Sequence, residues 1–267
     1  MLQKIWKYGQ TIVTRFFQEG ITTHAAGLAY VTLLSLVPLL TVVLSILSAF
    51  PIFEGMQEKI QHLLFSNLVA SSAQTVQQHL QIFIAQTSKL SPASMAFLFI
   101  TAVLMIFSME QAFNHIWRIR KRRNIIQAFL MYWAVLTLIP ILIGLGYAIS
   151  NYLMGFAIVS GAAALPGIKA IANSIAPYLF TFLALTFLYL TVPNCKVKFV
   201  HAALGAIIAA ILFELAKYGF TFYLTNFPTY RLLYGALATI PIFLVWLYLS
   251  WLIILFGAVI SHTVGKS

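Results

Sequence analysis

The sequence predicts an all-helical, polytopic membrane protein with six transmembrane helices, an N-terminal amphipathic helix and a small helical periplasmic cap. Hydrophobic residues make up 61% of the 267 residues and charged residues only 8%, whereas a soluble domain carries about 25% charged residues. The mean hydropathy is +0.95. The apolar residues also form uncharged runs long enough to cross a bilayer, which takes about 20 helical residues. We therefore expect residues 1–267 to form a single membrane domain.

The N-terminal segment, residues 1–18, is expected to form a basic amphipathic helix. Its apolar residues recur at helical spacing, and Lys4, Lys7 and Arg15 lie mostly off that stripe. Such a helix can lie in the cytoplasmic membrane interface. The alternative is that it packs on the cytoplasmic end of the helix bundle. Thr22 or Thr23 is the expected cap of the first spanning helix.

Residues 54–90 differ from the rest of the chain because they are rich in glutamine. Apolar residues still recur there at helical spacing, which predicts two amphipathic helices. Only two basic residues, Lys59 and Lys89, lie in this segment. We expect it to form the periplasmic cap.

The spans and their orientation follow from the apolar runs and the basic loops. Five basic residues lie between positions 118 and 123, and Lys196 and Lys198 lie in a later loop, so both loops are predicted to be cytoplasmic. With both termini cytoplasmic, most basic residues fall on that side. The first apolar run is far longer than the core of a signal peptide, so we expect no cleaved leader. The six spans are predicted at residues 24–50, 92–113, 128–153, 171–192, 201–223 and 235–260.

Glu214 and Lys217 lie one helical turn apart within the fifth predicted span. A charge near the middle of a bilayer costs about 2.5–3.5 kcal/mol on insertion scales, so these residues need partners and are candidates for function. One interpretation is a polar site that binds or gates a charged solute or a lipid headgroup. The other is an intrahelical pair that neutralises itself, with Lys217 directed outward.

Two further groups are candidate sites. Asn226, Arg231 and Tyr234 lie at the outer corner between the fifth and sixth spans, where Arg231 is expected to meet an anionic headgroup or Glu214. Glu110 and Arg118 are expected to share a helix face with Asn114 and Trp117 at the cytoplasmic end of the second span. There, Glu110 is a candidate partner for Arg118 or for a basic residue of another span. The alternative for both groups is interfacial anchoring.

Other function classes are disfavoured by the sequence. The single cysteine, Cys195, permits no intrachain disulfide and no thiolate cluster. Four histidines near predicted cytoplasmic helix ends lack ligand spacing, so no metal site is expected. No catalytic triad, phosphate-binding loop or dinucleotide turn is present, and we predict no catalytic residues and no cofactors. The net charge of +11 lies at the ends of apolar runs, which favours a topological role over nucleic-acid binding. The four histidines near predicted cytoplasmic helix ends are His24, His115, His201 and His262.

Several stretches with defined polar positions resemble the YihY/BrkB family of bacterial inner-membrane proteins, and its YihY branch in particular. The resemblance extends over nearly the whole chain. Members of that family often carry an acidic residue after the final Gly-Ala, but this chain has Val259, so no role is expected for that carboxylate. The matching stretches are LAYVTLLSLVPLL (Leu28–Leu40), NHIWR (Asn114–Arg118), LFELAKYGF (Leu212–Phe220), FPTYRLLYGALATIPIF (Phe227–Phe243) and WLYLSWLIILFGA (Trp246–Ala258).

The resemblance implies a bacterial inner membrane and six spans. Members have been labelled a virulence factor linked to serum resistance, and the family was formerly labelled ribonuclease BN, a role that the residues of this chain do not support. We expect a transporter or flippase-like protein for a lipid or other envelope component. The alternative is a non-transporting scaffold in envelope assembly, and an enzyme is disfavoured. The expected partner is the lipid bilayer, including anionic or envelope lipids, and no particular oligomeric state is predicted.

Overall fold

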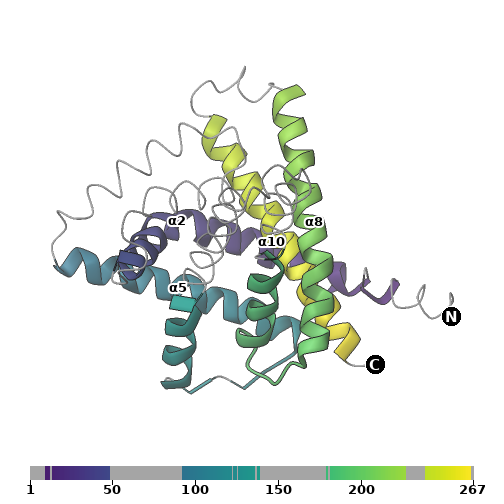
Figure 1. Cartoon of the computed structure of the whole chain (residues 1–267), viewed down its shortest axis with the longest axis horizontal. Coiled ribbons are helices and arrows are strands. Elements are labelled where there is room, and N and C mark those ends of the chain that lie inside the picture. The colour runs from purple at the N-terminus through teal and green to yellow at the C-terminus, as the bar shows by residue number, and fades with distance from the viewer. Residues whose placement is uncertain are drawn as a thin grey trace, which may run out of the picture.

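The computed structural model describes residues 10–48, 92–138, 179–226 and 238–265, apart from residues 13, 122, 125, 136 and 180. Every regular element in this part of the chain is a helix, as the sequence predicts (Figure 1). The predicted periplasmic cap lies outside the described residues, as do large parts of the third and fourth predicted spans. The four long helices are α2 (Ile21–Ser48), α5 (Pro92–Ile116), α8 (Phe199–Asn226) and α10 (Thr239–Gly265).

Three helices in the described part of the chain are long and apolar enough to cross a membrane. They are Ala96–Ile116 within α5, the whole of α8, and Ile240–Gly265 within α10. Shorter apolar helices cover Ile21–Leu36 within α2, Ile126–Val135 and Thr181–Thr191. A membrane protein with several spans is consistent with these helices, whereas the number six stays a prediction.

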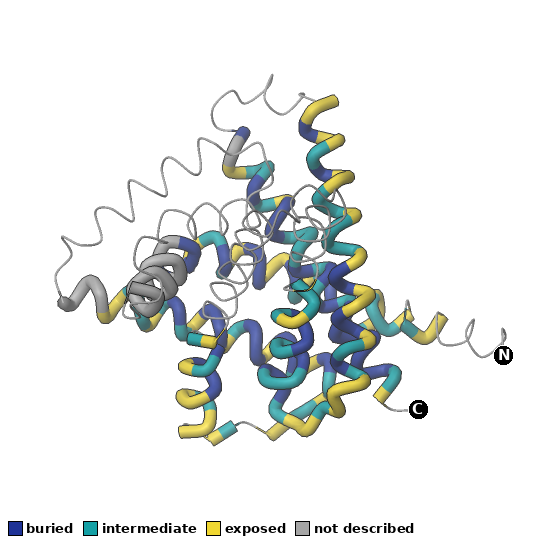
Figure 2. Tube along the Cα trace, viewed as in Figure 1, coloured by how far each residue is buried: buried dark blue, intermediate teal, exposed yellow. Residues whose placement is uncertain are grey.

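The helices are arranged around α10. This helix packs against α8 on one side and against α2 on the other, and α2 packs in turn against α5 (Figure 1). Buried residues concentrate where the helices cross, and exposed residues follow their outer faces (Figure 2). Many of the exposed residues are large and apolar, such as Leu215 and Phe222 on α8 and Leu104 on α5. In water such a surface would be unfavourable, but it matches the hydrocarbon of a bilayer.

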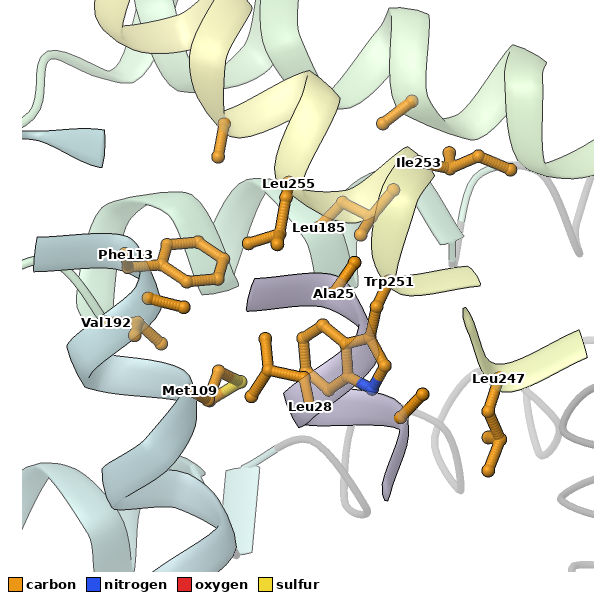
Figure 3. Close-up of a cluster of buried hydrophobic side chains, with 14 of the residues drawn as sticks. Ala25, Leu28, Met109, Phe113, Leu185, Val192, Leu247, Trp251, Ile253 and Leu255 are labelled. Atoms are coloured by element: carbon orange, nitrogen blue, oxygen red, sulfur yellow. The ribbon is translucent and has the colours of Figure 1, made fainter. Parts of the chain in front are cut away.

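Between α2, α5 and α10 the core is a dense cluster of apolar side chains around the indole of Trp251 (Figure 3). The indole Nε1 of Trp251 donates a hydrogen bond to Oγ1 of Thr32 at 2.9 Å, and that hydroxyl donates to the carbonyl of Leu28 at 2.6 Å. Each buried polar group in this chain of contacts therefore has a partner, as a low-dielectric environment requires. The pair fixes α10 against α2.

The contact between α8 and α10 is built from small residues. Gly205 and Ala209 of α8 lie against Gly257 and Ser261 of α10 so closely that a Cβ added to either glycine would overlap the other helix. Small residues at every fourth position let helix backbones approach one another, which is the common packing mode within membranes. The hydroxyl of Tyr189, from the helix Thr181–Thr191, also reaches this crossing and donates to the carbonyl of Ile254 at 2.8 Å.

Helix α2 begins at Ile21, so the cap predicted at Thr22 or Thr23 is wrong. Gly20 occupies that position, with a φ of 63°, and its carbonyl accepts hydrogen bonds from the backbone amides of Thr23 and His24. Glycine adopts this left-handed conformation without steric cost, so the chain can turn sharply between residues 10–18 and α2. The hydroxyl side chains of Thr22 and Thr23 placed the predicted cap two or three residues too far along the chain.

Candidate functional site

Glu214 and Lys217 form an ion pair on α8, with Nζ of Lys217 2.6 Å from Oε1 of Glu214. The carboxylate is 13% exposed and the ammonium side chain 25% exposed. The same carboxylate oxygen is buried and accepts no hydrogen bond of good geometry from any described residue. The ammonium group also lies 5.9 Å from the ring centre of Phe213. Lys217 is thus the partner of the carboxylate among the described residues, and it comes from the same helix.

The outer corner contributes one described residue, Asn226. Its side-chain amide donates to the carbonyl of Phe222 at 2.9 Å and to the hydroxyl of Thr225 at 3.1 Å, so it closes the last turn of its own helix. Arg231 and Tyr234 lie outside the described residues, and the expected contact between Arg231 and Glu214 stays a prediction.

Glu110 is 5% exposed and lies at the centre of a polar network near the end of α5. The hydroxyl of Tyr132 donates to Oε2 at 2.6 Å, and Nε of Arg123 lies 3.6 Å from Oε1. Asn114, one turn along α5, donates to Oε1 at 3.5 Å and accepts a hydrogen bond from the backbone amide of Asn194 at 2.8 Å. Glu110 is therefore a buried partner of a cation, but the cation is Arg123.

The expected pairing of Glu110 with Arg118 is wrong, and the end of α5 gives the reason. The helix ends at Ile116, and Arg118 adopts a left-handed conformation with a φ of 57°. The amide of Arg118 bonds to the carbonyl of His115 and the amide of Ile119 to that of Asn114, which is a Schellman closure. This turn removes the Arg118 side chain from the helix face that carries Glu110.

Arg118 instead pairs with Glu19, a residue that the sequence interpretation did not single out. Nη2 of Arg118 donates to Oε1 of Glu19 at 2.8 Å, and Nε of Arg15 lies 3.5 Å from the same oxygen. Nε2 of His115 lies 3.0 Å from the backbone carbonyl of Glu19. Glu19 thus ties the segment before α2 to the end of α5.

Residues 10–12 and 14–18 are helical, and this segment packs on the end of α10. The ring of Phe16 meets that of Phe256 edge to face at 5.5 Å. Nη1 of Arg15 lies 3.3 Å from Nδ1 of His262 and donates to Oγ1 of Thr263 at 3.4 Å. The described part of the N-terminal segment therefore contacts the bundle, which is the second of the two alternatives considered for it.

The four histidines do not converge. The rings of His24 and His115 lie 4.6 Å apart, but His262 faces Trp117 and Arg15, and His201 lies against Gly265. Among the described residues, no three histidine, cysteine, aspartate or glutamate side chains gather in an arrangement that could hold a metal ion.

The comparisons with known proteins agree on one family. The family model described as "Virulence factor BrkB" matches residues 12–267. A "UPF0761 membrane protein" of Alkalilimnicola ehrlichii is 45% identical over 255 residues, covering 96% of this chain and 57% of the relative. A protein of the same name from Aeromonas salmonicida is 42% identical over 259 residues, covering 97% of this chain and 89% of the relative.

A third relative of the same name, from Legionella pneumophila, is 43% identical over 256 residues, covering 96% of this chain and 61% of the relative. The chain thus spans about three fifths of the length of the Alkalilimnicola and Legionella proteins. No solved structure is significantly similar to it. The names of these relatives state a membrane location and no enzymatic activity. Together with the match over residues 12–267, they establish that the chain belongs to the BrkB family of membrane proteins.

Proposed function

We propose that this protein moves a lipid or another amphiphilic envelope component across the bacterial inner membrane, with Glu214 and Lys217 as the polar site on the path. The observation that carries the proposal is the ion pair itself, in which a buried carboxylate oxygen lies 2.6 Å from an ammonium group of the same helix and has no second partner among the described residues. A polar headgroup could therefore bind Lys217 without displacing a contact between described helices.

The position of the pair supports this role. Glu214 lies within about 3 Å of the midpoint of α8 along the helix axis, given a rise of 1.5 Å per residue over the 28 residues of the helix. If α8 crosses the membrane centrally, the pair lies near the middle of the hydrocarbon, where ionised groups are costly and commonly mark the path of a substrate. A purely structural role could be filled by apolar residues at lower cost.

The chemistry of the pair suits an amphiphile with an anionic headgroup. The ammonium of Lys217 can exchange the Glu214 carboxylate for a phosphate or carboxylate of a ligand, because both are anions of similar hydrogen-bonding character. Glu214 would then hold Lys217 charged and oriented between binding events. The predicted outer corner, with Asn226, Arg231 and Tyr234, would form a polar rim at the end of the same helix.

Location and orientation belong to the same proposal. We place the protein in the inner membrane with both termini cytoplasmic, because the basic residues between positions 118 and 123 and those at 196 and 198 then lie on the cytoplasmic side. The sequence contains no ATP-binding loop, so movement would follow a gradient or depend on a partner.

The test is lipid movement by purified protein in vesicles. Vesicles of phosphatidylcholine with a trace of fluorescent phosphatidylglycerol would be treated with an impermeant quencher, which reaches only the outer leaflet. We expect the protein to make the inner-leaflet probe accessible, and Glu214→Gln and Lys217→Met to reduce that rate at least about tenfold, the effect of about 1.4 kcal/mol. Tyr218→Phe, an exposed site on the same helix, is the matched control and should keep the parental rate.

A non-transporting scaffold is the competing function, and one observation favours it. Both charges of the pair come from a single helix, three residues apart, so the pair neutralises itself without another element. The scaffold predicts no lipid movement in the parental protein and unchanged recovery of co-purifying envelope proteins with Glu214→Gln. That combination of results would replace the transport proposal.

A further inference from the structure

A shallow pocket of ≈ 390 Å³ lies beside the Glu110 network, which it meets at Arg123. It is bounded by the start of the helix Ile126–Val135 on one side and by the end of the helix Thr181–Thr191 with its following loop on the other. The side chains that matter for its chemistry are Arg123, Gln127, Leu190, Asn194, Cys195 and Lys196. None of these residues belongs to the site proposed on α8.

Arg123 brings unused hydrogen-bond donors to this pocket. Its Nε donates to Oδ1 of Asn194 at 3.3 Å, and its Nη2 donates to the carbonyls of Thr191, Val192 and Pro193 at 3.1–3.4 Å. Nη1, which carries two further N–H groups, has no acceptor among the described residues. Buried polar side-chain atoms without partners in this part of the chain are confined to Glu214 and Ser261, so Nη1 is not completely buried.

The guanidinium is also held in a fixed position. The side chain of Arg123 is only 11% exposed, with Glu110 on one side and three carbonyls on another. A fixed, planar donor pair suits the oxygens of a phosphate group, because little side-chain entropy is lost on binding. Lys196 adds an exposed ammonium on the same pocket wall, and it forms no ion pair with any described residue.

The apolar surroundings of the pocket distinguish a lipid from a free anion. Leu190 lines the pocket, and Ile126 and Leu130, which are 74% and 61% exposed, lie on the helix that begins beside it. A phosphate in the pocket would therefore have exposed apolar side chains on the neighbouring helix. The pocket also lies next to the predicted cytoplasmic loops, the level at which anionic headgroups of the inner leaflet are found.

We propose that this pocket is a binding site for an anionic phospholipid of the cytoplasmic leaflet, whose phosphate is held by Nη1 of Arg123 and Nζ of Lys196. The acyl chains would lie along Ile126 and Leu130. The site is separate from the Glu214–Lys217 pair and does not depend on lipid transport.

The test measures lipid affinity with the full chain in detergent. Native mass spectrometry would follow the titration of phosphatidylglycerol and of phosphatidylcholine with identical acyl chains. We expect preferential binding of phosphatidylglycerol. Lys196→Gln should weaken it about fivefold, the effect of about 1 kcal/mol for one basic residue near anionic lipid. Lys198→Gln is the matched control, because it removes the same charge from the same loop outside the pocket and should leave the affinity unchanged.

Two further arms identify the ligand and the site. An excess of inorganic phosphate should not displace phosphatidylglycerol, and Tyr218→Phe, at an exposed position of α8, should bind it like the parental protein. Equal affinity for the two lipids, or equal losses with Lys196→Gln and Lys198→Gln, would overturn the site, because the attraction would then come from the loop charge as a whole. Displacement by inorganic phosphate would overturn the assignment to a lipid.

Discussion

The close crossing of α8 and α10 makes Gly257→Ala an informative perturbation. The added Cβ would lie 2.7 Å from the Cβ of Ala209 and 2.9 Å from the carbonyl oxygen of Gly205, and it would overlap the hydroxyl of Tyr189. Ordinary contacts of a Cβ begin near 3.4 Å. The Ala209 contact alone therefore requires the two helices to separate by roughly 0.7 Å, and a gap of that size forfeits about a quarter to a half of the dispersion energy of the affected contacts.

The expected loss of stability combines three effects. Overpacking of a tight contact costs about 1–3 kcal/mol. Displacing Tyr189 from the carbonyl of Ile254 loses a hydrogen bond worth about 1 kcal/mol. Replacing glycine by alanine inside a helix returns up to about 1 kcal/mol. We expect Gly257→Ala to lower the free energy of unfolding by about 1–3 kcal/mol.

The assay is unfolding in mixed micelles with increasing dodecyl sulfate, followed by tryptophan fluorescence, because Trp246 and Trp251 are buried on α10. Gly219→Ala on α8 is the matched control. Its added Cβ meets nothing within 4 Å, so only the gain in helix propensity remains. Its free energy of unfolding should stay equal to that of the parental protein or rise by up to about 1 kcal/mol.

A second variant separates the two sources of the clash. Adding Tyr189→Phe to Gly257→Ala removes the overlapping oxygen but leaves Ala209 and Gly205 in place, so only part of the lost stability should return. Parental stability of Gly257→Ala would refute the close crossing itself. Complete recovery in the double variant would show that the phenol, and not the helix contact, sets the spacing.

Two other predictions concern the network near the end of α5 and the loop beside it. Arg123→Gln leaves the Glu110 carboxylate buried without its cation and should lower the free energy of unfolding by about 3–5 kcal/mol in the same assay. Lys121→Gln, at an exposed position, is the control and should change that free energy little. The double variant Glu110→Gln/Arg123→Gln should lose less stability than the sum of the two single variants. Burial raises the pKa of the Cys195 thiol, and Arg123 partly opposes that rise. The thiolate fraction at neutral pH is therefore low, and maleimide labelling should be slow there and rise about tenfold per pH unit below the pKa. An impermeant maleimide should label Cys195 in inverted vesicles and not in intact spheroplasts, and the reverse would refute the predicted orientation.

Local sequence patterns predicted the helices and the polar pair on α8 because these features depend on neighbours along the chain. The i, i+3 spacing of Glu214 and Lys217 is sufficient to place both on one turn, and the ion pair at 2.6 Å follows from it. Likewise, the long apolar runs mark α5, α8 and α10 without knowledge of their partners.

The partners of Glu110 could not be predicted because they depend on how the chain turns after α5. Helical spacing alone favoured Arg118, but the left-handed residue at that position redirects its side chain toward Glu19, 99 residues away in sequence. Arg123 reaches Glu110 only because the loop folds back against Asn194. The sequence did indicate that a buried carboxylate such as Glu110 needs a cation as its partner. It could not indicate which one, because five basic residues lie between positions 118 and 123.

The three described carboxylates differ in the number of side chains that bind them. This difference separates structural from functional candidates. Glu110 has Tyr132, Asn114 and Arg123 as partners, so any ligand would have to displace contacts that hold α5 to its neighbours. Glu19 likewise binds two arginines. Glu214 has a single lysine on its own helix, and its buried oxygen has no second partner within the described part of the chain. A ligand that replaced Glu214 at Lys217 would break no contact between described helices. Glu214→Gln, which removes the charge and keeps those contacts, is therefore expected to alter the proposed lipid movement more than stability.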